Sequence, residues 1–564
     1  MSAGSSGGVE VLVAGAGPVG LTAAYELVRR GITVRVVDRA AGPAVTSRAT
    51  ATHARTLEVY HQMGILPDLL ARGQKCDHFT MHRRGRRLTS LGTDYSELPT
   101  RFPFTLQVDQ VITEEVLRTR LGELGVDVEW GVELESLVDD RGGVTARLRH
   151  VDAGTTEEFT SGWLIGADGA HSRVRKQLGI DLLGESSEKW MVADAYVDVD
   201  LPRDSLHWMH LSHGTILMVP FPEEGKWRLL DTDDVTDGDR PEVVRARFEA
   251  KMSEGLGRTV TVKELTWVSV FTIRQRMVET MRSGHCFLAG DAAHVHSPAS
   301  GQGLNTGIQD GYNLAWKLAS VIKGQADGGL LESYSAERVP IGEILLGSTK
   351  TATRLIALRN AAAPVLLPVG LGLLNVLKPL KHKVERKILR GMSGLALHYR
   401  TSPLTIGSPS AQADTSALAI RPGDRVSCSA EELEHSPGWQ AVCDELTDVR
   451  WTLLVFVGTG DVPAGVGRAH EEYGDALSVR VVRETRAPGT EEREGTDGGP
   501  GVLLDPGNRV RRAFAGEPGY ALVRPDGYLA ALGSLGDGEG LDALLRRVHL
   551  LPARRAASRP ESAE

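Results

Sequence analysis

Apolar and polar positions at the start of the chain follow the order strand, helix, strand. Residues 9–14 form a compact apolar run, the glycine-containing stretch 15–20 follows, and residues 21–30 have the spacing of a buried helix. A second apolar run over residues 32–37 ends at Asp38. The pattern predicts a β-α-β unit of about thirty residues, the context in which a glycine-rich turn binds a dinucleotide.

Two further apolar strands end in a glycine and an acid. Residues 163–167 run into Asp168 and Gly169, and residues 285–289 run into Gly290-Asp291. The carboxyl ends of parallel strands meet at one edge of a sheet, so we expect the three turns to converge on one ligand. The glycine-rich stretch 298–305 then opens a predicted helix over residues 306–322.

The rest of the chain predicts a second sheet and a second α/β unit. Short alternating strands over residues 191–270 indicate an antiparallel sheet, which the β-rich segment 79–108 is expected to join. The expected fold class is α/β, with a Rossmann-like nucleotide-binding domain, an antiparallel-sheet substrate domain and a C-terminal domain. The expected bounds are 1–185 with 280–345 for nucleotide binding, 186–279 for the middle domain, 346–410 for a helical connection, 411–552 for the C-terminal domain and 553–564 for a tail. A mobile loop is expected over residues 485–501.

Composition narrows the possible functions. The 564 residues are 41% hydrophobic and 24% charged, which is typical of a folded chain of several domains. A net charge of −9 argues against a nucleic-acid partner. The four cysteines show neither a C-x-x-C nor zinc spacing, so no disulfide framework and no metal are indicated.

Targeting signals are not evident in the sequence. The first eight residues lack the basic and apolar regions of a signal peptide. The apolar stretch Ala361 to Leu374 is interrupted by prolines and glycines and is shorter than the roughly 18 to 20 residues that a spanning helix needs. We expect no membrane span and a cytoplasmic location, with this stretch packed in a helix or an interface.

Each residue of the first glycine turn has a chemical reason for its place. Gly15 allows the tight turn, Gly17 lets the backbone approach a pyrophosphate, and Gly20 lets the helix lie close to the strand. The Asp38 carboxylate is placed to accept hydrogen bonds from ribose hydroxyls. Arg39 beside it could receive a 2′-phosphate, but the carboxylate would repel that phosphate, so the site suits FAD or NAD better than NADP.

The three motifs together resemble those of the class A flavoprotein aromatic hydroxylases of the para-hydroxybenzoate hydroxylase type. The resemblance rests on Gly15-x-Gly17-x-x-Gly20, Gly166-Ala-Asp168-Gly169 and Gly290-Asp291-Ala-Ala-His294, in that order, and covers about residues 9–345. Residues 411–551 look like the thioredoxin-like third domain of phenol hydroxylases and actinomycete aromatic-polyketide hydroxylases. That domain has no C-x-x-C here, so thiol redox chemistry in it is not expected.

The resemblance implies non-covalently bound FAD and a set of residues around it. Asp291 would bind the ribityl hydroxyls, Asp168 and Gly169 would border the pyrophosphate, and residues 298–305 would wrap the isoalloxazine ring. The acids also fit helix caps, which is compatible with that role. His294 is open between lining the active site and capping a helix end. The implied cofactor-binding residues are Gly15, Gly17, Gly20, Asp38, Arg39, Arg48, Gln107, Asp168, Gly169, Asp291, Pro298, Gly301, Gly303, Leu304 and Asn305, and the implied catalytic residues are Arg48, Pro298 and His294.

The resemblance also implies a reaction. NADPH or NADH would reduce the FAD, the reduced flavin would react with O₂, and a flavin C4a-hydroperoxide would deliver one oxygen atom to an aromatic ring. A Baeyer–Villiger oxygenase or an epoxidase would share every motif, and a non-catalytic flavin-binding protein is a further alternative. A polycyclic polyketide-type substrate is expected, with a homodimer as the possible assembly. Side chains of the middle sheet that could line the substrate pocket, or pack in the core, are Trp208, His210, Met218, Phe221 and Trp227.

Overall fold

The computed structural model of the protein describes most of the chain. The described residues are 8–47, 49–92, 98–140, 142–233, 240–296, 301–357, 391, 393–407, 420–458, 460–484, 500–514, 519–534 and 540–553. Several sequence predictions lie outside them: Arg48, Pro298, the stretch from Ala361 to Leu374, nearly all of the 485–501 loop, and the tail from residue 554.

A six-stranded sheet carries the three glycine turns. Its order is β18 (Arg282–Ser283), β19 (Cys286–Leu288), β12 (Trp163–Gly166), β1 (Val11–Ala14), β2 (Val34–Asp38) and β8 (Val128–Trp130). Strands β1, β12 and β19 are parallel, and Ala14 pairs with Gly166, which pairs with Leu288. The three strands therefore end side by side, as the sequence predicts.

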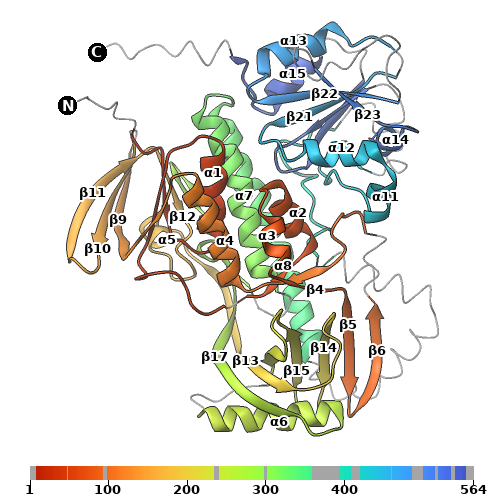
Figure 1. Ribbon diagram of the computed structural model, residues 1–564. Helices are drawn as coiled ribbons and strands as arrows, with labels where there is room; N and C mark the ends of the chain where they lie inside the picture. The colour runs from red at the N-terminus through yellow and green to blue at the C-terminus, as the bar shows by residue number, and fades with distance from the viewer. Residues whose placement is uncertain are drawn as a thin grey trace.

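Two helices pack closely beside this sheet edge. Helix α1 (Pro18–Arg29) follows the first turn, and α7 (Gln302–Ile322) runs upright through the centre of Figure 1. A Cβ built on Gly307 would lie 2.6 Å from Val19 Cγ2, and one built on Gly311 would lie 2.9 Å from the Val19 carbonyl oxygen. Glycines thus let α7 approach α1 at the level of the turns. The helix begins four residues earlier than the sequence pattern predicts.

The middle of the chain forms an eight-stranded sheet. Its order is β20 (His294–Val295), β17 (Thr261–Met277), β13 (Leu183–Asp198), β16 (Lys226–Asp231), β15 (Thr215–Pro220), β14 (Ser205–His210), β5 (His78–Arg83) and β6 (Arg86–Gly92). Helix α6 (Pro241–Leu256) covers one face and lies below the sheet in Figure 1.

The expected membership of residues 79–108 in this sheet is correct for β5 and β6 but wrong for β7 (Thr105–Gln107). Strand β7 pairs instead with β3 (Ala51–Thr52) and β4 (Gln74–Cys76) in a small sheet of its own. The expectation of an antiparallel sheet also needs one correction, because β14 and β5 run parallel.

The remaining elements of this half surround the two sheets. Strands β9 (Val132–Asp140), β10 (Gly143–His150) and β11 (Thr155–Ser161) form a three-stranded antiparallel sheet on the left of Figure 1. The other elements are α2 (Ala54–Gln62), α3 (Leu66–Leu70), α4 (Gln110–Glu123), α5 (Arg173–Gln177), the short helices η2 (Gly290–Ala292) and η4 (Gly328–Leu331), and α8 (Glu332–Ala357).

The C-terminal part has its own sheet and core. Its strand order is β23 (Gly501–Leu504), β22 (Leu477–Arg483), β21 (Trp451–Phe456), β24 (Gly519–Val523) and β25 (Leu529–Ser534). Strands β21 to β23 are parallel, and β24 and β25 are antiparallel to their neighbours. The helices are α11 (Ala430–His435), α12 (Pro437–Glu445), α13 (Ala464–Tyr473), α14 (Arg509–Phe514) and α15 (Gly540–Arg547). Trp316 of α7 packs edge-on to Trp451, so α7 joins this core to the rest of the molecule.

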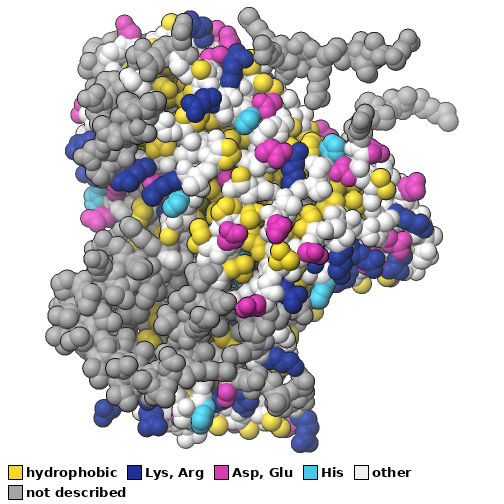
Figure 2. Space-filling view, turned by 180° about the vertical axis from the view of Figure 1, so that it is seen from behind, with side chains coloured by type: hydrophobic (Ala, Val, Ile, Leu, Met, Phe, Trp, Pro, Cys, Tyr) yellow, Lys and Arg dark blue, Asp and Glu magenta, His cyan; other side chains and the backbone are white. Residues whose placement is uncertain are grey.

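Three further observations concern the charges on the surface, the cysteines and the apolar character of the helices. Figure 2 shows Lys and Arg side chains interspersed with Asp and Glu over the rear face. All four cysteines are buried and free. Among the described residues, none of the helices is both long enough and apolar enough to cross a membrane.

Candidate functional site: a flavin-nucleotide site

The first glycine turn leaves a helix N-terminus open to a ligand. Gly17 caps α1 with no side-chain cap, Pro18 follows it, and no acidic residue stands in the first turn. A Cβ on Gly17 would meet no atom within 4 Å, whereas one on Gly15, where φ is +108°, would lie 2.3 Å from the Ala167 carbonyl oxygen. Unpaired N–H groups and a positive dipole end therefore face open space, which suits a pyrophosphate.

Asp38 lies beside this turn, at the end of β2. Its Oδ2 accepts a hydrogen bond of 2.7 Å from the Ala16 amide, and its Oδ1 accepts one from the Ala40 amide. The carboxylate thus fixes the glycine turn, while its remaining lone pairs are available to a ribose. Arg39 is exposed.

Asp168 accepts backbone hydrogen bonds at the start of a helix whose N-cap residue is Ser172. Its Oδ2 accepts hydrogen bonds from the amides of Arg173 and Val174 at the start of α5, and its buried Oδ1 has no partner among the described atoms. Gly169 follows with φ +78°. Arg175, which the sequence did not single out, donates to the Ala292 carbonyl oxygen and ties this turn to the next one.

The third turn is held by a buried carboxylate on α7. Asp310 Oδ2 accepts from the Gly290 amide and lies 2.6 Å from His294 Nε2, and Asp310 Oδ1 accepts from Arg338 Nε at 2.6 Å. Burial alone would raise the pKa of Asp310, but Arg338 and His294 outweigh it and lower the pKa to about 2. Asp291, on the same turn, is exposed.

His294 is buried and engaged with Asp310. With 1% of its surface exposed, it contacts the same carboxylate that accepts the Gly290 amide. Its ring centroid lies 4.8 Å from that of His296. His296 was not singled out in the sequence, and both of its ring nitrogens are buried and unpartnered among the described atoms. Burial lowers the pKa of His296 to about 3.

The start of α7 lies against the strand that follows Arg48. Gly301 caps the helix at φ +63° with no side-chain cap. Asn305 donates to the Ala51 and Gly301 carbonyl oxygens and accepts from the His53 amide. Residues 301–305 and the strand Ala51–Thr52 are therefore brought together, while Gly303 has open space where a Cβ would stand.

Gln107 is a buried amide whose surroundings fit a cofactor contact. It lies on β7 opposite Ala51, its side chain is 1% exposed, and neither its amide nitrogen nor its amide oxygen has a partner among the described atoms. A buried primary amide without partners is costly in a finished structure, so a bound group is expected to satisfy it. Together with the open helix terminus, this amide fits a flavin dinucleotide.

The middle sheet presents one face to this site. Arg228 of β16 pairs with Asp194 at 2.8 Å and donates to the Ser47 carbonyl oxygen at 2.7 Å. Asp231, on the opposite face, instead pairs with Arg247 and Lys251 of α6. The strand register therefore identifies the face of Arg228 as the one beside the nucleotide-binding sheet.

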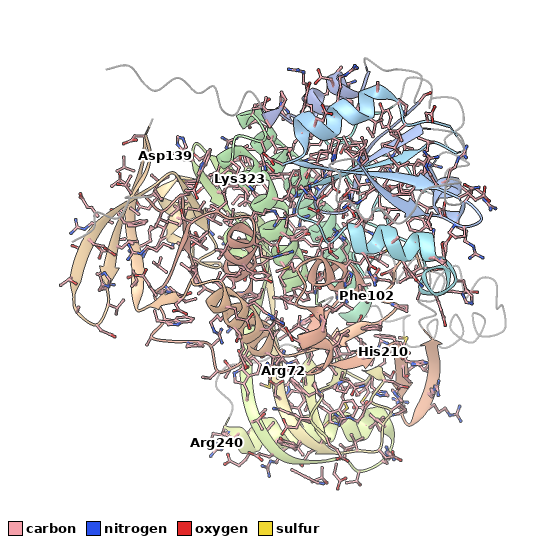
Figure 3. The ribbon with its side chains drawn as sticks, turned by 45° about the horizontal axis from the view of Figure 1, so that its top comes forward. Arg72, Phe102, Asp139, His210, Arg240 and Lys323 are labelled. Carbon is pink, nitrogen blue, oxygen red and sulfur yellow. The ribbon has the colours of Figure 1, made fainter. Side chains whose placement is uncertain are left out.

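The five candidate substrate residues divide between these faces. The register puts Trp208 and His210 on the face of Arg228, and Figure 3 labels His210 within this sheet. Phe221, just after β15, has the centre of its ring 5.4 Å from the Arg228 guanidinium carbon. Met218 and Trp227 instead belong to the core beneath α6, which is the second of the two alternatives that the sequence left open for them. Burial lowers the pKa of His210 to about 4.

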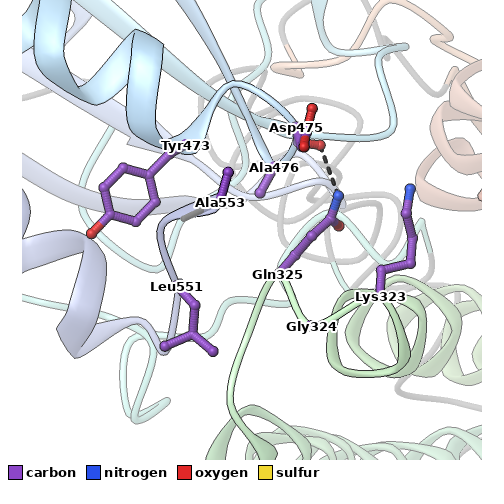
Figure 4. Close-up of a pocket in the computed structure, with 8 residues that line it drawn as sticks. All are labelled: Lys323, Gly324, Gln325, Tyr473, Asp475, Ala476, Leu551 and Ala553. Atoms are coloured by element: carbon purple, nitrogen blue, oxygen red, sulfur yellow. Dashed lines mark hydrogen bonds between the residues drawn. The ribbon is translucent and has the colours of Figure 1, made fainter. Parts of the chain in front are cut away.

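Two other features lie away from the turns. A cavity of about 320 Å³ between the end of α7 and the C-terminal part is lined by Lys323, Gln325, Tyr473 and their neighbours (Figure 4) and contains no predicted site residue. Asp77, His78 and Asp204 form a cluster with spacing suited to a metal, which the sequence did not indicate. Both acids are exposed, and such groups occur commonly without an ion.

Comparison with known proteins agrees with this geometry. The model of a family described as FAD binding domain matches residues 8–349. The chain is 51% identical over 99% of its length to 6-methylpretetramide 4-monooxygenase of Streptomyces rimosus, and 96% of that protein is covered. It is 31% identical over 96% of its length to pentachlorophenol 4-monooxygenase of Sphingobium chlorophenolicum, of which 98% is covered.

The chain is also similar to solved structures over nearly its whole length. The structure of OxyS anhydrotetracycline hydroxylase from Streptomyces rimosus is 30% identical, with a TM-score of 0.71 over 96% of this chain and 99% of that one. The flavin-dependent monooxygenase PieE, solved with FAD and substrate, is 25% identical, with a TM-score of 0.77 over 97% of this chain and all of its own.

Proposed function

The chain belongs to the FAD-binding domain family and is an FAD-dependent monooxygenase that uses NAD(P)H, and we propose that it hydroxylates 6-methylpretetramide or a closely related polycyclic aromatic. The observation that carries the substrate is the 51% identity to 6-methylpretetramide 4-monooxygenase over 99% of the chain. The single-ring enzyme, pentachlorophenol 4-monooxygenase, is far less similar at 31%. O₂ is the proposed oxidant.

The proposed cofactor site uses this chain's own groups in distinct ways. The open N-terminus of α1, with Gly15, Gly17 and Gly20, would hold the pyrophosphate, and Asp38 the ribose. Gln107, Asn305 and the glycines of residues 301–303 would surround the ring, together with Arg48, Pro298 and Leu304. Asp291 would bind the ribityl chain, with Asp168 and Gly169 beside the pyrophosphate. When bound, FAD supplies the redox chemistry between NAD(P)H and oxygen.

The protein's part is to bind the aromatic ring, orient it and exclude water. The apolar face of the middle sheet, with Trp208 and Phe221, would form one wall of that pocket. A large ligand buried there supplies binding free energy away from the reacting carbon, and that energy can orient the ring. Burial lowers the pKa of His210 to about 4, so it would present a neutral ring to the substrate at physiological pH.

The domain division is part of the same proposal. A nucleotide-binding domain of residues 1–185 with 280–345 and a middle domain of residues 186–279 precede a helical connection and a thioredoxin-like domain of residues 411–552. The order β22-β21-β24-β25, with a parallel first pair followed by antiparallel strands, supports a thioredoxin-like fold. A homodimer and a cytoplasmic location are further predictions from the sequence.

Substrate-dependent oxidation of NADPH by the FAD-loaded protein tests the proposed substrate. With 6-methylpretetramide we expect strong stimulation and a product heavier by one oxygen atom and carrying a new phenol. Pentachlorophenol, as the single-ring comparison, is expected to stimulate weakly and to yield mostly H₂O₂. Equally tight coupling with both compounds would reject the polycyclic assignment, and a lactone or epoxide product would assign the alternative oxygenation chemistry.

A further inference from the structure

Two adjacent residues of α8 face two different parts of the molecule. Glu337 contacts the C-terminal domain, and Arg338 contacts the Gly290–Ala292 turn through Asp310. The side chains of both residues are fully buried. A displacement of this turn of α8 would therefore change the contacts with the C-terminal domain and those with the Gly290–Ala292 turn.

The contacts of Arg338 reach the proposed flavin site. Its Nε donates to Asp310, the carboxylate that accepts the Gly290 amide, and its Nη2 donates to the Thr306 carbonyl oxygen in the first turns of α7. Arg338 thus fixes both the turn that carries Asp291 and the helix start that follows the 298–305 stretch.

The contacts of Glu337 reach the C-terminal domain. Arg524 donates to Glu337 Oε1 at 2.6 Å and to Oε2 at 2.9 Å, and Lys317 of α7 donates to Oε2 at 2.7 Å. Arg524 also forms two bonds to Asp526, whose Oδ2 accepts from Trp316 and Asn313 of α7.

Tyr399 contacts both Arg338 and Arg524. Arg338 Nη1 donates to the Tyr399 hydroxyl at 2.9 Å, and the guanidinium carbon of Arg524 lies 4.7 Å from the centre of the Tyr399 ring. The chain of contacts from Arg524 to the Gly290 amide therefore passes along two routes, one through the Glu337–Arg338 backbone and one through Tyr399.

The charges make this network rigid. Lys317, Glu337, Arg338 and Arg524 are each at most 1% exposed as side chains, so breaking any pair would leave a charge buried without its partner. Burial lowers the pKa of Lys317 to about 8, against the pull of Glu337. Buried networks of this kind hold one arrangement because alternatives leave polar groups unsatisfied.

We propose that the C-terminal domain positions the Gly290–Ala292 turn for the flavin, with Arg524 as the positioning residue acting through Glu337, Arg338, Tyr399 and Asp310. The inference rests on the proposed FAD site. The C-terminal domain, which has no C-x-x-C, would then contribute to cofactor affinity in addition to its structural role.

The test is titration of the full-length apoprotein with FAD, followed by quenching of flavin fluorescence, at a temperature where every variant is folded by circular dichroism. Arg524→Gln is expected to weaken FAD binding by about tenfold, which lies within the range of ordinary coupling between sites. Arg524→Lys is expected to restore part of the affinity. Tyr399→Phe, which deletes a single hydroxyl, is a mild variant that is expected to weaken binding by about threefold.

Arg480→Gln is the matched control. It breaks an ion pair with Glu445 inside the same domain, and the hydrogen bonds of Arg480 to described residues stay within that domain, so FAD affinity is expected to stay within about twofold of the parent. Asp291→Ala reports on the proposed site itself. Unchanged affinity in both Arg524→Gln and Tyr399→Phe would overturn the positioning role. If Asp291→Ala alone weakened binding, the FAD site would stand without it; if Asp291→Ala too left the affinity unchanged, the proposed site would fail as well.

Discussion

At the scale of single residues, the most informative groups are buried polar atoms without a partner. In the part of the chain that the structure describes, Gln107 has two such atoms and His296 has two more; Gln107 lies opposite Ala51, and His296 precedes the 298–305 stretch in sequence. Asp310 is the opposite case, because both of its carboxylate oxygens have hydrogen-bond partners within the protein. Unpartnered groups point to a ligand, and satisfied ones to the frame that holds the site.

Gln107→Leu is predicted to affect stability and cofactor binding in opposite directions. The substitution removes two unpartnered polar atoms at nearly constant volume, so the thermal midpoint of the apoprotein is expected to stay the same or rise. FAD affinity is expected to fall by about 1.5 to 3 kcal/mol, because the hydrogen bonds to the cofactor are lost. Calorimetry of the apoprotein and a flavin titration measure the two quantities. A destabilised apoprotein with unchanged FAD affinity would show that Gln107 is structural.

Buried histidines predict acid sensitivity. Burial lowers the pKa of His82 and of His210 to about 4, from 6.5 in the unfolded chain. Between pH 6.5 and 4 the unfolded chain binds protons that the folded chain does not, so stability is expected to fall as the pH falls. Each such histidine contributes a slope of up to about 1.4 kcal/mol per pH unit.

Urea unfolding at a series of pH values checks this. His210→Gln is expected to make the loss of stability with acid shallower, and the same change at exposed His213 is expected to leave the slope as it is. Parallel slopes for the parent and His210→Gln would show that His210 does not resist protonation.

At the scale of elements, the sequence predicted those features that depend on residues close together in the chain. The glycines and acids that end β1, β12 and β19 are such local signals, and the three turns do lie side by side. The faces of the middle sheet gave no such signal, because α6 covers one face and the other lies toward the nucleotide-binding sheet, so both faces are largely buried. Met218 and Trp208 could not be told apart for that reason. Asp310 and Arg338 lie inside two different helices and belong to none of the motifs, and only the tertiary structure brings them together.

Two glycines of one turn are predicted to respond differently to alanine. A Cβ at Gly17 would meet no protein atom, so Gly17→Ala is expected to change apoprotein stability by less than about 1 kcal/mol while weakening FAD at least about tenfold. A Cβ at Gly20 would lie 1.9 Å from the Gly15 carbonyl oxygen, so Gly20→Ala is expected to destabilise the apoprotein by about 2 kcal/mol or more. Urea unfolding and flavin titration compare them. Equal effects on stability would contradict the assigned roles.

At the scale of the whole molecule, α7 and α8 join the six-stranded sheet with its glycine turns to the C-terminal sheet. Helix α7 packs on α1 beside the glycine turns and on Trp451 of the C-terminal core, while Arg338 of α8 holds the third turn. The C-terminal domain is therefore tied into the frame of the nucleotide site. The relatives covered along nearly their whole length include 6-methylpretetramide 4-monooxygenase and pentachlorophenol 4-monooxygenase, so the chain is similar along its length to enzymes named for different substrates.

Oxygen transfer from isotopically labelled O₂ tests the central claim most directly. The FAD-loaded protein, supplied with NADPH, 6-methylpretetramide and heavy-isotope O₂, is predicted to give a hydroxylated product with one labelled oxygen atom by mass spectrometry. A product without label, or NADPH consumption that the polycyclic compound fails to stimulate, would contradict the account.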